Sequence, residues 1–177
     1  MSNNQVLSSF VAVLYHVGQE VQPVNVVTGD FHFGRNSSYL VMEKSLTAAY
    51  SIHTLAFKFD VRGYYPDHMS AYVTCVDDIG GYRYDLLSYS TDWYVCLESD
   101  LWRESDAQED NKWMMTYTGE VRKYNGEERA VFTLKNMNIN RYVEVVRQNQ
   151  FTYLKLTPEA SRASHFMFRK VKDIEFS

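Results

Sequence analysis

The chain alternates between short apolar segments and polar or glycine-containing turns, and this pattern predicts strands. The first segment, residues 6–17, is almost continuously apolar from Phe10 and ends at Gly18. A short, valine-rich apolar run between turn residues is typical of a buried strand, although a buried helix is the alternative. Near the end of the chain, similar segments follow closely at 140–146, 151–156 and 166–168. We therefore expect an all-β protein.

Two local signals add detail to this pattern. Asn125-Gly126 lies between two strand-like runs, which strongly indicates a β-hairpin. Residues 157–161 begin with a capping threonine followed by proline and an acidic residue, so one or two helical turns are expected there. Residues 45–59 also fit a helical period, but three β-branched residues weaken that interpretation.

The strand pattern repeats along the chain. A tyrosine begins a short strand at Tyr39, Tyr94 and Tyr142, at spacings of 55 and 48 residues. Each is followed by a second apolar run and then by a large-x-large triplet, at 57–59, 113–115 and 166–168. Self-similarity at a roughly fixed period indicates an internally repeated fold. The repeats cover approximately 24–60, 80–118 and 127–171.

Three copies of a four-strand unit resemble the β-trefoil superfamily, and the tyrosine-led strands are similar to its fascin, hisactophilin and fibroblast-growth-factor-like branches. The resemblance implies a β-trefoil-like barrel of about 12 strands with pseudo-threefold repeats. Residues 6–17 would then form an extra N-terminal strand, and 64–79 an inserted hairpin. Another closed or sandwiched antiparallel fold is the alternative.

Composition sets the size and compartment of this fold. The 177 residues are 45% hydrophobic and 15% aromatic, which predicts a single domain, residues 1–177, with its own core. The N-terminus shows no secretory signal, and no apolar run reaches the roughly 18 residues of a membrane span. We therefore expect a cytoplasmic protein without a membrane span, in which Cys75 and Cys96 are buried, reduced thiols.

Charge is distributed unevenly along the chain. Residues 1–111 carry 15 acidic and 6 basic side chains, whereas residues 112–177 carry 7 acidic and 12 basic ones. This asymmetry indicates either an acidic or basic partner or simply charges spread over solvated faces. The sequence pI of 5.7 argues against a nucleic-acid partner, because phosphate binding needs a dominant basic face.

Motifs for catalysis and for metal binding are absent from the sequence. It has no nucleophile elbow, phosphate-binding glycine loop, H-E-x-x-H or paired C-x-x-C. The five histidines are dispersed, and the acidic stretch 98–110 lacks the glycine and spacing of a calcium loop. The prediction is a protein that is not an enzyme, with no cofactor and no metal site.

Aromatic side chains beside polar ones mark the candidate ligand-binding residues. The turn Tyr64, Tyr65, Asp67 and His68 combines ring faces with a carboxylate and an imidazole, although both tyrosines can instead cap the core. Further candidates, each an exposed anchor or a residue folded onto the core, are Asp92, Trp93 and Trp102.

The resulting hypothesis is a non-catalytic binding module that recognises a glycan or a protein partner through its loops. The repeated Q-x-W motifs of ricin-type trefoil lectins are missing, which puts that particular sugar site in doubt. The alternative is a protein-interaction domain of the cytoskeletal or protease-inhibitor type. The sequence does not indicate an oligomeric state.

Overall fold

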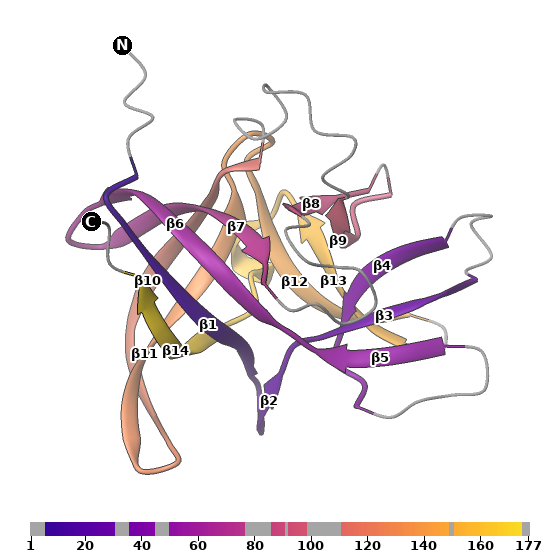
Figure 1. The fold of residues 1–177 in the computed structure, drawn as a ribbon, viewed down its shortest axis with the longest axis horizontal. Coiled ribbons are helices and arrows are strands. Elements are labelled where there is room, and N and C mark those ends of the chain that lie inside the picture. Colours follow the sequence, from indigo (N-terminus) through magenta and orange to yellow (C-terminus); the bar gives the residue numbers. More distant parts are fainter. Residues whose placement is uncertain are drawn as a thin grey trace.

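Strands dominate the computed structural model, which describes residues 6–30, 36–44, 50–76, 86–90, 92–98, 111–148 and 151–174 (Figure 1). The strands are β1 (Ser8–Val17), β2 (Val21–Pro23), β3 (Asn25–Asp30), β4 (Asn36–Val41), β5 (Tyr50–Thr54), β6 (Ala56–Tyr64), β7 (His68–Cys75), β8 (Leu86–Tyr89), β9 (Val95–Glu98), β10 (Trp113–Tyr124), β11 (Glu127–Asn136), β12 (Arg141–Gln148), β13 (Phe151–Thr157) and β14 (Phe166–Ile174). No α-helix lies among these described residues, so the all-β class is confirmed.

Six strands pair in a sequence that returns to its starting point. β1 pairs with β6, β6 with β7, β7 with β10, β10 with β11, β11 with β14, and β14 with β1, all antiparallel. We call these six the ring strands. β6 shows why they face a common core, because Phe57, Phe59 and Val61 are buried while the residues between them are less so.

The remaining strands connect the ring strands as hairpins. β3 and β4 lie between β1 and β6 in the chain, β8 and β9 between β7 and β10, and β12 and β13 between β11 and β14. The first connection also contains β2, which pairs with β1, and β5, which pairs with β3. In Figure 1, β3, β4, β8 and β9 lie on the opposite side of the molecule from β10, β11 and β14.

The three hairpins meet at a cluster of tyrosines. Tyr39, Tyr94 and Tyr153 come from one hairpin each, with ring centroids 4.9–6.2 Å apart and all three side chains buried. Their backbones follow one pairing rule: Tyr39 pairs opposite Cys96, Tyr94 opposite Lys155, and Tyr153 opposite Val41. In each case the partner lies two positions after another tyrosine of the cluster: Cys96 after Tyr94, Lys155 after Tyr153, and Val41 after Tyr39.

This cluster corrects the third tyrosine of the sequence pattern. Tyr142, which the sequence matched with Tyr39 and Tyr94, lies one strand earlier on β12, where it pairs with Thr157 and Lys135. Tyr153, and not Tyr142, is therefore the residue that contacts Tyr39 and Tyr94.

The N-terminal segment and the predicted inserted hairpin also take a different place from that expected. β1 pairs with β14 on one side and β6 on the other, so it is an integral member of the sheet and no extra strand at its edge. Residues 64–76 likewise contain β7, which pairs with β6 and β10. Both segments carry core residues, including Phe10, Leu14 and Val73, which explains their long-range pairing.

The local turn signals are confirmed. Asn125 and Gly126 have φ values of 50° and 81° and connect β10 to β11, as a hairpin turn with two left-handed residues requires. A 3-10 helix, η3 (Ala160–Arg162), follows β13 where helical turns were expected. The alternative helix over 45–59 is wrong from residue 50 onward, because Tyr50–Thr54 forms β5, which pairs with β3, and residues 56–59 begin β6.

Candidate functional site

A pocket of about 430 Å³ lies between ring strands and the β10–β11 hairpin. β10 pairs with β7 as far as Thr116, and then continues with β11 as a hairpin, residues 117–132, that projects from the ring. Figure 1 shows this projecting hairpin extending away from the rest of the sheet. The pocket is lined by residues of this hairpin together with residues of β1, β6, β7 and β14.

Five aromatic side chains line the pocket. Phe168 on β14 contacts two other phenylalanine rings of the pocket. Its ring centroid lies 5.0 Å from that of Phe10 on β1 and 5.2 Å from that of Phe132 on β11. Tyr64 and Tyr117 also line the pocket, and both are exposed to solvent. The pocket thus has an apolar floor continuous with the core and two accessible tyrosines at its edge.

Backbone and side-chain contacts hold these two tyrosines in place. The hydroxyls of Tyr64 and Ser8 are hydrogen-bonded at 3.1 Å, and the amide of Tyr117 donates to the carbonyl of Asp67 at 2.9 Å. Burial, and then the neighbouring Tyr64, raise the pKa of the Tyr117 phenol above its ordinary value. Tyr117 therefore keeps its proton, and its hydroxyl is both a donor and an acceptor at neutral pH.

Charged groups at the pocket come from β11 and β14. Arg129 donates through Nη2 to the carboxylate of Glu127, with which it forms an ion pair. The Lys170 ammonium lies 4.7 Å from the centroid of the Phe10 ring, a cation–π geometry. The pocket therefore presents two cations and one carboxylate beside its aromatic wall.

The structure brings four of the sequence-predicted residues together in the β6–β7 turn. Tyr65 stacks on the imidazole of His68 at a centroid distance of 4.3 Å, and His68 Nδ1 lies 2.7 Å from Asp67 Oδ1. The hydrogen bond with His68 lowers the pKa of the Asp67 carboxyl. Of this group Tyr64 lines the pocket, whereas Tyr65, Asp67 and His68 stand beside it as a self-contained stack.

The other candidates lie in a different region. Asp92 is exposed on the β8–β9 turn, and Trp93 is half-buried, stacked on Tyr89 and covered by the Arg141 guanidinium at 3.9 Å from its ring centroid. The Trp93 indole is therefore in contact with two neighbouring side chains. Figure 1 places this turn away from the β6–β7 turn. Trp102 lies outside the described residues.

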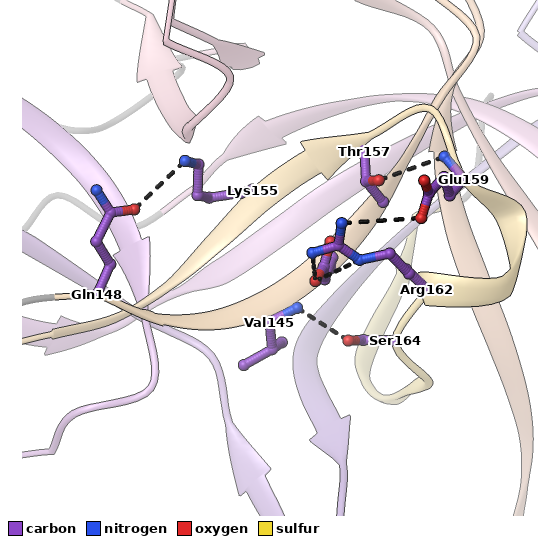
Figure 2. Close-up of polar contacts among 8 residues, drawn as sticks. Val145, Gln148, Lys155, Thr157, Glu159, Arg162 and Ser164 are labelled. Atoms are coloured by element: carbon purple, nitrogen blue, oxygen red, sulfur yellow. Dashed lines mark hydrogen bonds and ion pairs between the residues drawn. The ribbon is translucent and has the colours of Figure 1, made fainter.

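A second polar cluster joins β12, β13 and η3, as Figure 2 shows. Arg162 donates through Nε and Nη2 to Glu144 Oε1 at 3.1 and 2.7 Å, and its Nη1 lies 3.8 Å from Glu159 Oε2. Lys155 Nζ donates to Gln148 Oε1 at 3.3 Å. The cluster borders a cavity of about 250 Å³, but its arginine is matched by two carboxylates, so the contacts fasten η3 onto the hairpin.

Sequence reasoning missed Phe10, Tyr117, Arg129 and Lys170 as pocket residues. The predicted Asn125–Gly126 turn already implied that the segments around Tyr117 and Arg129 lie on paired strands. Phe10 and Lys170 are separated by almost the whole chain and meet because β1 pairs with β14. No local motif reports such a long-range pairing.

Metal-binding clusters and disulfides are both absent from the described part of the chain. No group of three or more His, Cys, Asp or Glu residues there has the arrangement of a metal site. Cys75 is buried in the core and Cys96 half-buried at the tyrosine cluster, and the two are not joined in a disulfide. Helices with the length and apolarity to cross a membrane do not occur among these residues. No protein-family model matches the chain, and no curated protein matches its sequence.

Proposed function

We propose that the fold is a β-trefoil made of three copies of one unit. In each unit two ring strands flank a hairpin, which gives units of residues 8–64, 68–124 and 127–174. The cyclic pairing of Tyr39, Tyr94 and Tyr153 supports a threefold relation between the hairpins. These boundaries differ from the sequence-based ones because β1 and β7 count as ring strands.

On this frame we propose a non-catalytic binding module that recognises a glycan. The observation that carries the proposal is the pocket, where the exposed Tyr64 and Tyr117 stand at the edge of an aromatic wall with Glu127 and Arg129 beside them. A sugar ring stacks one face on an aromatic side chain, while its hydroxyls need both donors and acceptors. Arg129 supplies donors, Glu127 supplies acceptors, and the tyrosine hydroxyls supply both.

The size and shape of the pocket agree with a small oligosaccharide. A volume of about 430 Å³ lies within the range of small-ligand sites, which combine a mostly apolar lining with a few polar groups that fix orientation. The core residues Phe10 and Phe132 shape its floor, so the pocket is largely formed before a ligand arrives.

A glycan array probed with the labelled full chain tests the proposal. Tyr64→Ala removes a pocket ring, and Tyr65→Ala is its matched control, because the two tyrosines are 53% and 56% exposed but Tyr64 alone of the pair lines the pocket. We expect at least a tenfold weaker signal for Tyr64→Ala and an unchanged signal for Tyr65→Ala. Equal loss in both variants, or no glycan bound by the wild type, contradicts the proposed site.

A protein partner is the second candidate, because exposed apolar side chains gather at the same end of the molecule. Leu7, Tyr64, Tyr65 and Tyr117 are all exposed, and Leu7 joins this group through the hydrogen bond from its amide to Val61, near the end of β6. Such a patch on a soluble surface often marks a protein interface. Leu7→Ser and Tyr65→Ala should weaken binding to a protein partner but leave glycan binding intact. Actin co-sedimentation and protease-inhibition assays test the two types of protein partner suggested by the sequence.

A further inference from the structure

Arg129 has an unusual environment for a charged side chain. It is only 14% exposed, whereas its ion-pair partner Glu127 is 69% exposed. Among the described residues, Arg129 Nε is buried and has no hydrogen-bond partner. A buried donor without an acceptor is unfavourable, so a group that supplied the acceptor would be bound favourably.

The surrounding charges favour an anionic acceptor over a neutral one. Arg122 lies directly opposite Arg129 on the paired strand, and like charges placed opposite each other in a sheet repel. Lys170 lines the same pocket from β14. Arg122 donates to the carbonyl of Gln19 at 3.5 Å, which satisfies a hydrogen bond without neutralising its charge. Glu127, mostly in solvent, is the carboxylate at the pocket itself.

From these contacts we infer that the ligand of the pocket is a sugar carrying an anionic substituent, a carboxylate or a sulfate, whose oxygen accepts the Nε proton of Arg129. The inference rests on the proposed glycan-binding function. The sugar ring lies against Tyr64 and Tyr117, and the anionic group reaches the guanidinium. Hydrogen bonds between a guanidinium and an anion are about twice as strong as neutral ones.

Matched pairs of oligosaccharides, identical except for one substituent, test this inference with the wild-type chain. One arm compares oligosaccharides with and without a terminal sialic acid, a second compares a uronic acid with its neutral hexose, and a third compares a sulfated with an unsulfated sugar. We expect at least tenfold tighter binding of the anionic member in the carboxylate arms or in the sulfate arm, and the arm that responds identifies the group.

Variants then locate the preference. Arg129→Gln should abolish the anionic preference, whereas Arg147→Gln, which removes an equal charge from an arginine 65% exposed and outside the pocket, should preserve it. Glu127→Gln should strengthen binding of the anionic member, because it removes the competing carboxylate. Circular dichroism of each variant shows whether it is folded, and the wild-type comparison decides the inference even if Arg129→Gln does not fold.

The two proposals fail in different ways. Equal binding of neutral and anionic members, with the Tyr64→Ala effect intact, overturns the anionic ligand but keeps the glycan site. If Arg129→Gln retains the anionic preference and Arg147→Gln loses it, the preference comes from general surface charge. That result overturns the role of Arg129. Absence of binding to every glycan overturns both.

Discussion

Tyrosines concentrate in two regions of this molecule, and the two groups have opposite surroundings. Tyr39, Tyr94 and Tyr153 pack edge to face where the three hairpins meet, and each is at most 4% exposed. At the pocket, Tyr64 and Tyr117 stand in solvent beside charged groups. The difference follows from position in the sheet. Tyr39, Tyr94 and Tyr153 each pair with a residue of another hairpin, whereas Tyr64 is the last residue of β6 and Tyr117 follows the last β10 residue that pairs with β7.

We expect the first group to contribute mainly to stability, while the proposed function assigns ligand binding to the second. Buried aromatic side chains contribute both apolar area and specific ring geometry to the folded state. Half-exposed ones retain much of their hydration, so removing them changes the folded state little. The same residue type therefore has different roles at the two ends of the sheet.

The largest effect is expected from Tyr153→Ala in the hairpin cluster. The substitution leaves a cavity among Tyr39, Tyr94 and Phe151, and should lower the free energy of unfolding by about 3–5 kcal/mol, as for other large-to-small changes of buried aromatics. Urea denaturation measures it. Tyr142→Ala, on the half-buried β12 position, is the control and should cost clearly less; equal costs would break the comparison.

A smaller effect is expected from Gly126→Ala at the turn of the projecting hairpin. Gly126 has φ of 81°, a left-handed conformation that costs an alanine about 1–2 kcal/mol. Because open space surrounds the missing side chain, the loss should come from backbone strain and not from a clash. Denaturation should show a loss near that size, while Glu128→Ala, an exposed neighbour on β11, should show almost none. A loss in both variants would point to the hairpin surface instead of the turn.

These two residues also show how far the sequence could predict the molecule. Gly126 follows Asn125, and that local dipeptide was enough to predict both the turn and the two strands. The sequence could not identify Tyr153 as the third tyrosine of the buried cluster, because that depends on whether β12 or β13 faces the other two hairpins. The pocket itself was not predicted. Of the candidate residues named from the sequence only Tyr64 lines it, whereas Phe10 and Lys170 meet through pairing of the first and last strands.

Trp93 illustrates the same limit. The sequence left it as either an exposed anchor or a residue folded onto the core, and the structure shows a half-buried ring that stacks on Tyr89 and contacts the Arg141 guanidinium of β12. The positive φ of 69° at Trp93 fits the turn at residues 90–94, where its amide donates to the carbonyl of Ser90. Long-range cation–π contacts of this kind have no signature in the local sequence.

A modest, pH-dependent effect is expected from His16, on β1 and away from both tyrosine groups. Burial, and then the nearby His165, lower the pKa of His16 from 6.5, and Glu120 faces His165 with Nδ1 and Oε2 3.9 Å apart. The unfolded chain therefore binds a proton more readily, and stability should fall as pH drops from about 6.5 through the lowered pKa. Above that range His16 is neutral in both states and contributes no pH dependence.

Denaturation of the wild type and of His16→Gln between pH 7.5 and 5 measures this contribution. The variant should lose less stability on acidification than the wild type, and the two curves should run parallel above pH 7. Identical acid sensitivity would show that other groups control it.

The smallest effect on stability is expected from Tyr64→Ala, and this variant gives the most direct comparison between a pocket tyrosine and a buried one. The ring is 53% exposed, and the hydrogen bond between its hydroxyl and that of Ser8 lies at the surface, so the free energy of unfolding should change by less than about 0.5 kcal/mol. Ligand binding by Tyr64→Ala should nevertheless fall at least tenfold. Tyr153→Ala should show the opposite pattern, with a large loss of stability and normal ligand binding by the fraction that remains folded. Urea denaturation and the glycan array, applied to both variants, give the four values needed. If Tyr64→Ala destabilised the chain as much as Tyr153→Ala did, the pocket tyrosines would belong to the structural core, and the division between the two ends of the sheet would be wrong.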